Sequence, residues 1–236
     1  MNVLITGAST GIGFELAKQF DVLGHKVLAI SRNEKRLEEL NRICSQENAA
    51  SRLVTCAFDL EMLTDNDAVL MKILTDEFQV LDILINNAGY LVRKDFRDTD
   101  CTEIIKSMTV NYIAPARLIK SCLPLLTGSA RAHVINIGSM GGYQGSKKFP
   151  GLSFYSSAKG ALAVLTECLA EEFSGTKIRF NCLALGAVQT EMLSKAFPGL
   201  QAPLSARGMA DFIRDFAING YDYFNGKILP VSGTTP

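Results

Sequence analysis

Short runs of apolar residues alternate with longer amphipathic stretches along the whole chain. The runs are rich in Val, Ile and Leu, are too short for helices and lack a polar face, which suits strands buried on both sides of a sheet. They are Val3–Ile5, Val27–Ile30, Leu53–Ala57, Leu81–Ile85, His133–Ile137, Ile178–Ala184 and Ile228–Val231. The pattern therefore predicts about seven strands.

Helical patterns lie between these runs. They span Gly13–Leu23, Glu34–Gln46, Asp65–Phe78, Thr102–Leu126, Ser156–Phe173 and Ala206–Ile218. Strands that alternate with helices are typical of an open parallel sheet with helices on both faces, because parallel strands need crossover connections. No Pro-, Gly- or Ser-rich linker, charge block or internal repeat divides the chain. We predict an α/β fold, a doubly wound parallel sheet, in one domain of residues 1–236.

Two stretches rich in glycine and proline interrupt the alternation. Ser139–Phe154 follows the fifth predicted strand, and Leu185–Ser205 follows the sixth. Open α/β sheets bind ligands at the carboxyl ends of their strands, and long loops there are often functional. We therefore expect a ligand crevice at this edge.

Composition narrows the possible functions. Hydrophobic residues make up 47% of the chain and the mean hydropathy is +0.16, which excludes a disordered chain. The 24 Lys and Arg residues balance the 24 Asp and Glu residues, which argues against nucleic acid or an anionic membrane as the main partner. No apolar run reaches the roughly 18 residues of a membrane span.

The cysteines and histidines predict no metal site. The six cysteines are scattered without a C-x-x-C pair, and the chain has only two histidines, His25 and His133. Scattered cysteines are typical of reduced residues in a cytosolic protein. Because the first strand and loop begin at once, we expect no targeting peptide and a cytoplasmic location.

A glycine-rich segment, Thr6–Gly13, joins the first strand to the first helix with the spacing G-x-x-x-G-x-G. Such glycines allow a tight turn and a close approach of backbone N–H groups to a pyrophosphate, which then lies at the positive end of the helix dipole. The alternative is that the glycines only shape a strand-to-helix turn. The residues predicted to contact a dinucleotide are Gly7, Ser9, Thr10, Gly11, Ile12 and Gly13.

The end of the second strand predicts which dinucleotide binds. It carries Ser31 and Arg32, with no acidic residue before Glu34. A guanidinium suits a 2′-phosphate, which a carboxylate would repel. We therefore predict NADP(H) rather than NAD(H), with Arg32 as the main determinant and Ser31 assisting; the alternative is a solvated arginine. Asp59, beside Leu60 in the predicted site, either accepts a bond from the adenine amine or caps the next segment.

Tyr155 and Lys159 stand four residues apart at the start of a predicted helix, which places their Cβ atoms about 5–6 Å apart on one face. An ammonium about 4 Å from a phenol favours the phenolate. The pair therefore predicts a tyrosine whose pKa is lowered towards neutrality for general acid–base catalysis. The spacing alone is common in helices.

Three further polar positions converge on the same predicted edge. Ser139 follows the fifth strand, where its hydroxyl could hold a substrate carbonyl oxygen, and Asn86–Gly89 ends the fourth strand. Asn111 lies in a predicted apolar helix, where an asparagine is disfavoured unless its amide has a hydrogen-bond partner such as a bound water. Each position alone could serve a turn or a cap, and their convergence favours a catalytic site.

These motifs, in this order, resemble the compact single-domain short-chain dehydrogenase/reductases over essentially the whole chain. The resemblance implies a Rossmann-type sheet and reversible hydride transfer between a nicotinamide and a carbonyl or alcohol. It implies that Tyr155 is the proton donor and acceptor and that Ser139 orients the carbonyl. It also implies that Lys159 lowers the tyrosine pKa and binds the nicotinamide ribose, while Asn111 holds a proton-relay water.

The resemblance further implies that Asn87, Ala88 and Gly89 flank the cofactor. The segment with Gly186 and Val188 would line it, and Thr190 would meet the carboxamide. The sequence departs from the family in three ways: Leu185-Gly186 replaces the usual Pro-Gly, the segment between Ser139 and Tyr155 is longer, and Thr10 is not basic. The four-residue spacing of Tyr155 and Lys159 argues against the enoyl-reductase branch.

The predicted substrate walls are Tyr90–Lys94, Met140–Phe154 and Ala187–Pro203, which are mostly apolar. They favour a small hydrophobic ketone, aldehyde, alcohol or oxoacyl group. Lys147 and Lys148 either contact an anionic tail or are solvated.

The Ser156–Phe173 helix is apolar on more than one face, and the family pairs this helix with the Thr102–Leu126 helix across two-fold axes. We therefore expect a homodimer or homotetramer. Two other functions remain open: a catalytically silent NAD(P)-binding regulator or redox sensor, and an epimerase or dehydratase. The second usually has a larger carboxyl-terminal substrate domain, whereas only a short segment follows Thr190.

Overall fold

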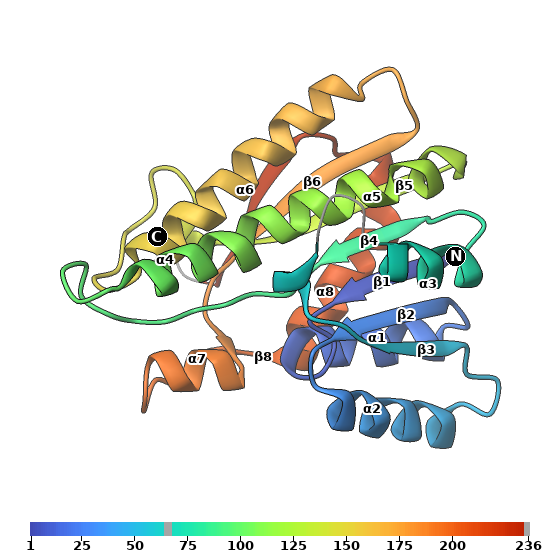
Figure 1. The fold of residues 1–236 in the computed structure, drawn as a ribbon, viewed down its shortest axis with the longest axis horizontal. Helices are drawn as coiled ribbons and strands as arrows, with labels where there is room; N and C mark the ends of the chain where they lie inside the picture. The colour runs from blue at the N-terminus through green and yellow to red at the C-terminus, as the bar shows by residue number, and fades with distance from the viewer. Residues whose placement is uncertain (64–67, 234–236) are drawn as a thin grey trace.

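The computed structural model describes residues 1–63 and 68–233. In these residues, seven parallel strands form one sheet in the order β3-β2-β1-β4-β5-β6-β9 (Figure 1). The strands are β1 (Asn2–Thr6), β2 (Lys26–Ser31), β3 (Leu53–Ala57), β4 (Ile83–Asn86), β5 (Ala132–Ser139), β6 (Ile178–Leu185) and β9 (Lys227–Val231). The strand order reverses between β1 and β4, and such a switch point opens a crevice at the carboxyl ends of the strands.

The central strands are buried on both faces, which explains their continuous apolar sequences. Val3, Leu4 and Ile5 of β1 have no solvent exposure. The predicted seven-stranded, doubly wound fold is confirmed, whereas the boundaries 1–236 of the domain stay a prediction.

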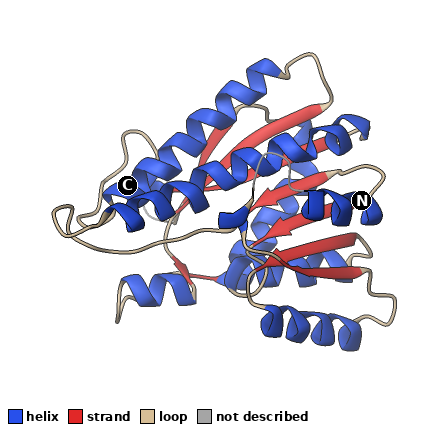
Figure 2. Cartoon of the chain, viewed as in Figure 1, coloured by secondary structure: helices blue, strands red, loops and turns tan. Residues whose placement is uncertain are grey.

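Helices cover both faces of the sheet and enclose two apolar cores (Figures 1 and 2). One face carries α1 (Gly11–Val22), α2 (Glu34–Glu47) and α8 (Ala206–Asn219), and the other carries α3 (Ala68–Glu77), α5 (Ala114–Gly128) and α6 (Ser153–Glu172). The start of the predicted helix Asp65–Phe78 lies outside the described residues.

The predicted helix Thr102–Leu126 forms as one uninterrupted helical segment, but its hydrogen-bond pattern changes along its length. It consists of α4 (Cys101–Met108), a π-helical turn at Thr109–Ile113 and α5. A capping box between Asp100 and Glu103 begins α4. A π-helical turn adds a residue to one turn of a helix and often marks a functional site; here it carries Asn111.

The two predicted loops contain regular structure. The first forms a 3₁₀ turn at Met140–Gly142 before α6 begins at Ser153, so Tyr155 lies in the first turn of that helix. The second contains β7 (Val188–Gln189), α7 (Glu191–Ala196) and β8 (Leu204–Ser205), and β7 pairs with β8. Figure 1 shows α7 on the side towards which the arrowheads of the strands point. Both segments therefore lie at the expected edge of the sheet.

The part of the chain that the structure describes contains neither a membrane-spanning helix nor a cluster of metal-ligating side chains. None of its helices combines the length and the apolar character needed to cross a membrane. No three of its His, Cys, Asp or Glu side chains are grouped as metal ligands would be.

Candidate functional site

A cavity of about 940 Å³ lies at the carboxyl edge of the sheet, and nearly all of the predicted site residues line it. They are Gly7, Ser9, Thr10, Gly11, Ile12, Ser31, Arg32, Asp59, Leu60, Asn87, Ala88, Gly89, Ser139, Tyr155, Lys159, Gly186, Val188 and Thr190. Gly13 and Asn111 lie behind this lining and act on it indirectly.

The glycine loop packs too tightly to hold any side chain at two of its glycines. Gly7 has a φ of +68°, and a Cβ there would lie 2.8 Å from the Ala88 Cα. A Cβ at Gly13 would lie 2.4 Å from the carbonyl oxygen of Gly7. These contacts bring the loop, the end of β4 and the start of α1 together, as a cradle for a pyrophosphate requires.

The N-terminus of α1 suits an anion. Its N-cap, Thr10, makes no side-chain capping hydrogen bond, and no acidic residue lies in the first turn. The first N–H groups of a helix need acceptors, and the positive end of the helix dipole favours negative charge. The residues present therefore fit a dinucleotide phosphate.

Thr6 is a contributor that sequence reasoning missed. Its Oγ1 accepts hydrogen bonds from the N–H groups of Asn87 at 3.1 Å and Ala88 at 3.0 Å. The Asn87 amide in turn donates to the Thr6 carbonyl oxygen at 2.9 Å. The glycine loop and the turn after β4 are thus one hydrogen-bonded unit. Asn86 does not line the cavity and instead donates to Asn136 in the sheet.

Ser139 and Tyr155 come together as predicted. Ser139 ends β5, Tyr155 lies in the first turn of α6, and the Ser139 hydroxyl is near enough to the Tyr155 phenol to lower its pKa. The Ser139 Oγ also accepts from the N–H of Gly141 at 3.1 Å, which fixes its position. Two hydroxyl groups therefore meet at one point of the cavity wall.

The expected effect of Lys159 on the pKa of Tyr155 is not found, which is a correction. Burial raises the pKa of Tyr155 above its ordinary value, and the neighbouring Ser139 hydroxyl opposes that rise. The Lys159 Nζ lies 6.0 Å from the Tyr155 ring centroid and donates instead to the carbonyl oxygen of Ile137 at 2.7 Å. Burial also lowers the pKa of Lys159 to about 8. The distance of the Lys159 Nζ from the Tyr155 ring and the lowered pKa of Lys159 together explain why the lysine does not lower the pKa of Tyr155.

Asn111 is fully buried in the π-helical turn. Its amide donates to the carbonyl oxygens of Tyr90 at 2.8 Å and Ser107 at 2.9 Å, and its Oδ1 accepts from the Tyr90 N–H at 3.1 Å. Both amide protons are therefore engaged in holding the segment after β4. A Cβ at Gly89 would lie 3.3 Å from this Oδ1 and 3.9 Å from the Lys159 Nζ, so Asn111 supports the wall beside the lysine.

The end of the cavity next to β2 is charged. The Arg32 Nη1 lies 2.9 Å from the Glu61 Oε1 and 3.9 Å from the Asp59 Oδ2. Asp59 also caps the 3₁₀ turn at Leu60–Met62 by accepting from the N–H of Glu61, which was one of its two predicted roles. Ser31 donates to the Ser9 hydroxyl at 2.7 Å and so joins β2 to the glycine loop.

The turn after β6 is fixed despite its lack of the usual proline. Gly186 donates to the Val231 carbonyl oxygen at 2.9 Å, and a Cβ there would lie 2.6 Å from the Ser232 hydroxyl. Beyond it, the Thr190 hydroxyl accepts from the Leu193 N–H and caps α7. The segment therefore holds α7 against the cavity.

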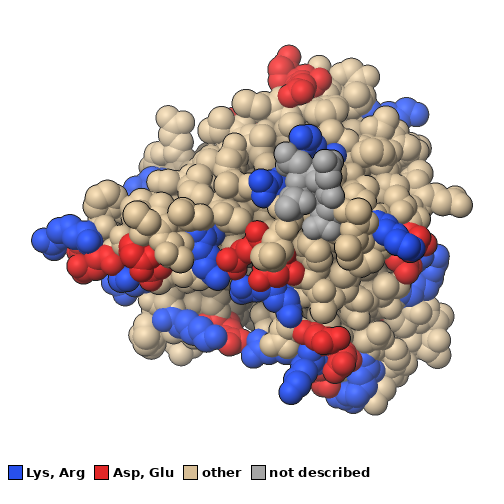
Figure 3. Space-filling view, viewed as in Figure 1, with Lys and Arg blue, Asp and Glu red and all other residues tan. Residues whose placement is uncertain are grey.

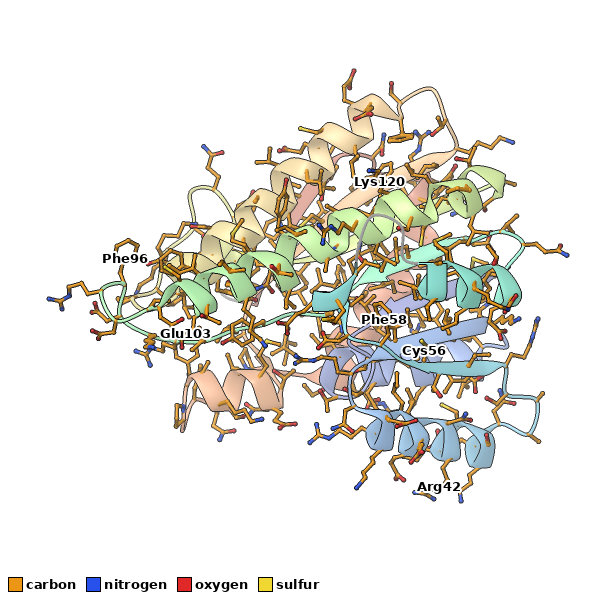
Figure 4. All side chains as sticks on the ribbon, viewed as in Figure 1. Arg42, Cys56, Phe58, Phe96, Glu103 and Lys120 are labelled. Atoms are coloured by element: carbon orange, nitrogen blue, oxygen red, sulfur yellow. The ribbon has the colours of Figure 1, made fainter. Side chains whose placement is uncertain are left out.

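The remaining wall is mainly apolar, as predicted. It includes Met140, Phe149, Leu152, Met192, Leu193, Phe197 and Leu200. The longer segment after Ser139 contributes to it through Phe149 and Lys147, whereas Phe154 stacks on Phe96 at 5.3 Å. Figure 4 labels Phe96 at the outer end of the loop before α4, and Phe58, which lines the cavity after β3.

Sequence reasoning also missed an ion pair that joins α2 to α7. Arg36 of α2 lies 2.8 Å from Glu191 of α7, which also pairs with Lys195 at 2.7 Å. These cations lower the pKa of Glu191 to about 2. Figure 3 shows charged side chains along α2 and α7 and a mostly uncharged surface over α5 and α6. No local motif marks a pair of residues so distant in sequence.

Comparison with known proteins identifies the family. Residues 1–201 match the family described as short chain dehydrogenase. The chain belongs to the short-chain dehydrogenase/reductase family. It is therefore an NAD(P)-dependent oxidoreductase, and the resemblance inferred from its motifs is confirmed.

Curated proteins with similar sequences agree with that assignment. The chain is 27% identical over 210 residues to an uncharacterized oxidoreductase of Staphylococcus epidermidis, covering 89% of this chain and 87% of that protein. It is 31% identical over 193 residues to a fatty acyl-CoA reductase of Acinetobacter baylyi, covering 81% of this chain. The match spans only 63% of the length of that reductase.

A solved short-chain dehydrogenase has a closely similar structure. It is a putative member of the family from Escherichia coli CFT073 in complex with NADPH. Its TM-score is 0.89 at 26% identity, and the match covers 97% of this chain and 95% of that chain.

Proposed function

We propose that the protein transfers hydride between NADP(H) and the carbonyl or secondary alcohol of a fairly apolar small molecule. The single observation that carries this proposal is that Ser139 and Tyr155 line the same cavity as the glycine loop, with the Ser139 hydroxyl near enough to the phenol to lower its pKa. The two hydroxyl groups can hold one carbonyl oxygen, while the loop suits a pyrophosphate.

The dinucleotide would run from the glycine loop to Lys159. Gly7, Gly11 and the first turn of α1 would hold its phosphates, and Lys159 would hold the nicotinamide ribose. When bound, it supplies or accepts the hydride. Asn87, Ala88 and Thr190 line the space between these ends.

Tyr155 gives its phenolic proton to the carbonyl oxygen during reduction and takes it back during alcohol oxidation. The raised pKa of Tyr155 keeps this proton in place at neutral pH, which suits the reductive direction. Ser139 donates to the same oxygen and fixes its position. Asn111, whose amide is engaged in the wall, supports Lys159 by holding the segment at Tyr90 and Gly89.

The preference for NADP(H) rests on Arg32, whose guanidinium lies at the cavity end next to β2. The similar protein from Escherichia coli CFT073 was solved with NADPH, which supports the same dinucleotide here. The apolar wall supports a hydrophobic ketone, aldehyde or oxoacyl substrate. The similarity to a fatty acyl-CoA reductase agrees with that class.

The catalytically silent alternative is less well supported. A regulator that only binds a dinucleotide has no need of Ser139, Tyr155 and Lys159 on one wall, and all three line the cavity. The test is a panel of ketones, aldehydes and oxoacyl thioesters followed by NADPH absorbance, with Tyr155→Phe as control. We expect NADPH oxidation with an apolar carbonyl and its loss in the variant, while calorimetry shows NADP⁺ still bound. Full activity in the variant would contradict the role of Tyr155.

We also propose that the chain forms a homodimer or homotetramer through α4, α5 and α6. Ile105 of α4 and Val164 of α6 are 65% and 58% exposed, and the surface over α5 and α6 carries little charge (Figure 3). Sedimentation of the wild type and of Val164→Glu tests this: we expect an oligomer that dissociates in the variant. A wild-type mass of one chain would contradict it.

The unpaired cysteines agree with a cytoplasmic location.

A further inference from the structure

The proposed determinant of NADP(H) binding, Arg32, already has an anionic partner. Its Nη1 lies 2.9 Å from the Oε1 of Glu61, and both residues line the cavity. The same Oε1 lies 2.8 Å from the Nζ of Lys106 on α4. One carboxylate therefore joins two cations at the end of the cavity next to β2 and β3.

The position of Glu61 is fixed by its main chain. Its N–H donates to the Asp59 Oδ1 at 3.0 Å, and Leu60–Met62 forms a 3₁₀ turn. Its side chain is only 25% exposed. Asp59 uses one carboxylate oxygen in this cap, and its other oxygen is 3.9 Å from Arg32. Glu61 is thus the carboxylate in direct contact with the guanidinium.

A 2′-phosphate and the Glu61 carboxylate would compete for the same guanidinium. Both are anions that accept charge-assisted hydrogen bonds, and like charges at this range repel each other. A ribose 2′-hydroxyl, in contrast, can donate a hydrogen bond to a carboxylate. Rossmann folds that bind NAD(H) use an Asp or Glu side chain in this way. The same side chain therefore acts in opposite directions on the two dinucleotides.

We propose that Glu61 is a specificity-determining residue that moderates the preference for NADP(H) over NAD(H). This inference rests on the proposed function. Glu61 reduces the cationic charge that Arg32 and Lys106 offer to a 2′-phosphate, so the wild-type protein discriminates less between the two dinucleotides than Arg32 alone would allow.

The test is direct binding of NADP⁺ and NAD⁺ by calorimetry to the wild type and to Glu61→Gln. Glutamine has nearly the same shape and removes only the charge. From what ion pairs of this exposure contribute, we expect the ratio of the Kd for NAD⁺ to the Kd for NADP⁺ to rise by about three- to fivefold. High salt should reduce this difference.

Two controls make the result specific. Glu39→Gln makes the same charge change on α2 at an exposed residue paired with Arg42, outside the cavity lining, and should leave the ratio unchanged. In an Arg32→Ala background, Glu61→Gln should change the ratio less than in the wild type, because Arg32 is gone and only Lys106 remains paired with this carboxylate. Glu61→Ser provides a second charge-removing variant if the glutamine protein does not fold.

The outcomes separate the two proposals. An unchanged ratio in Glu61→Gln, or weaker NADP⁺ binding, would overturn the inference, since Glu61 would then only support Arg32 structurally. A wild-type protein that binds neither dinucleotide would instead overturn the proposed function. A raised ratio that depends on Arg32 supports both.

Discussion

Lys159 donates a hydrogen bond to the carbonyl oxygen of Ile137 at 2.7 Å. This bond holds a buried ammonium in the cavity wall, next to β5, with its Nζ 6.0 Å from the centroid of the Tyr155 ring. Burial lowers the pKa of Lys159 to about 8, so its charge is lost as the pH rises through that value.

The pH dependence of carbonyl reduction should report this lysine. Reduction needs a protonated Tyr155, whose pKa is raised, and benefits from a charged Lys159. We expect kcat/KM to be level near neutral pH and to fall as pH rises through about 8, because Lys159 loses its proton there. Lys159→Met should be slower and lack this fall. A fall at the same pH in the variant would contradict the assignment.

The glycine loop should not accept a methyl group at Gly13. A Cβ there would lie 2.4 Å from the Gly7 carbonyl oxygen, so Gly13→Ala must push the loop out of place. Overpacking of this kind costs about 1–3 kcal/mol. We expect a loss of that size in urea unfolding, together with weaker dinucleotide binding. Gly175→Ala is the matched control, because a Cβ at Gly175 meets nothing within 4 Å.

His133 should make the fold sensitive to acid. It is buried, its Nδ1 faces the Ala217 carbonyl oxygen at 3.0 Å, and its Nε2 faces the Asn181 amide nitrogen at 3.0 Å. A neutral ring that donates from Nδ1 and accepts at Nε2 satisfies both partners, whereas a protonated ring would turn a second N–H towards a donor. Burial lowers the pKa of His133 to about 4.

The folded and unfolded chains differ in how readily His133 takes up a proton. Between the ordinary pKa of 6.5 and the folded pKa of about 4, the unfolded chain takes up a proton that the folded chain does not. The free energy of unfolding should therefore fall as pH falls from 6.5 to 4, by about 3 kcal/mol. Urea unfolding at several pH values measures this. His133→Asn should show a flatter profile, and an equally steep one would contradict the prediction.

Removing the Thr6 hydroxyl should damage the site without touching the cofactor. Thr6→Val leaves the N–H of Ala88 without its acceptor and the N–H of Asn87 with only the Ile85 carbonyl oxygen at 3.1 Å, and an unsatisfied buried donor costs about 1–3 kcal/mol. We expect lower stability in thermal unfolding and a raised KM for NADPH. Thr6→Ser keeps the hydroxyl and should retain most of both properties. Equal behaviour of the two variants would show that the hydroxyl is not what matters.

The sheet and most of the cavity lining could be predicted from the sequence, because both depend on local signals. Apolar runs marked the strands, and the glycine loop, Ser139 and Tyr155 lie at strand or helix ends that the alternation located. The π-helical turn around Asn111 could not be predicted, because no residue pattern in the sequence marks it, and the bond from the Asn111 amide to Tyr90 joins residues 21 positions apart.

Pairings between distant segments were also beyond the sequence. Arg36 and Glu191 are 155 residues apart, and Arg32 and Glu61 are 29 apart. The predicted direction of the pKa shift of Tyr155 was wrong. Residue spacing gives the distance between the Cβ atoms of Tyr155 and Lys159, but not the acceptor to which the flexible lysine side chain donates.

The Thr6 hydroxyl has an implication for protein engineering. Because it ties the turn after β1 to the turn after β4, neither turn is an independent module. Transplanting one of them from a relative would leave it docked against a foreign neighbour, so chimaeras of this protein should exchange both turns together or neither.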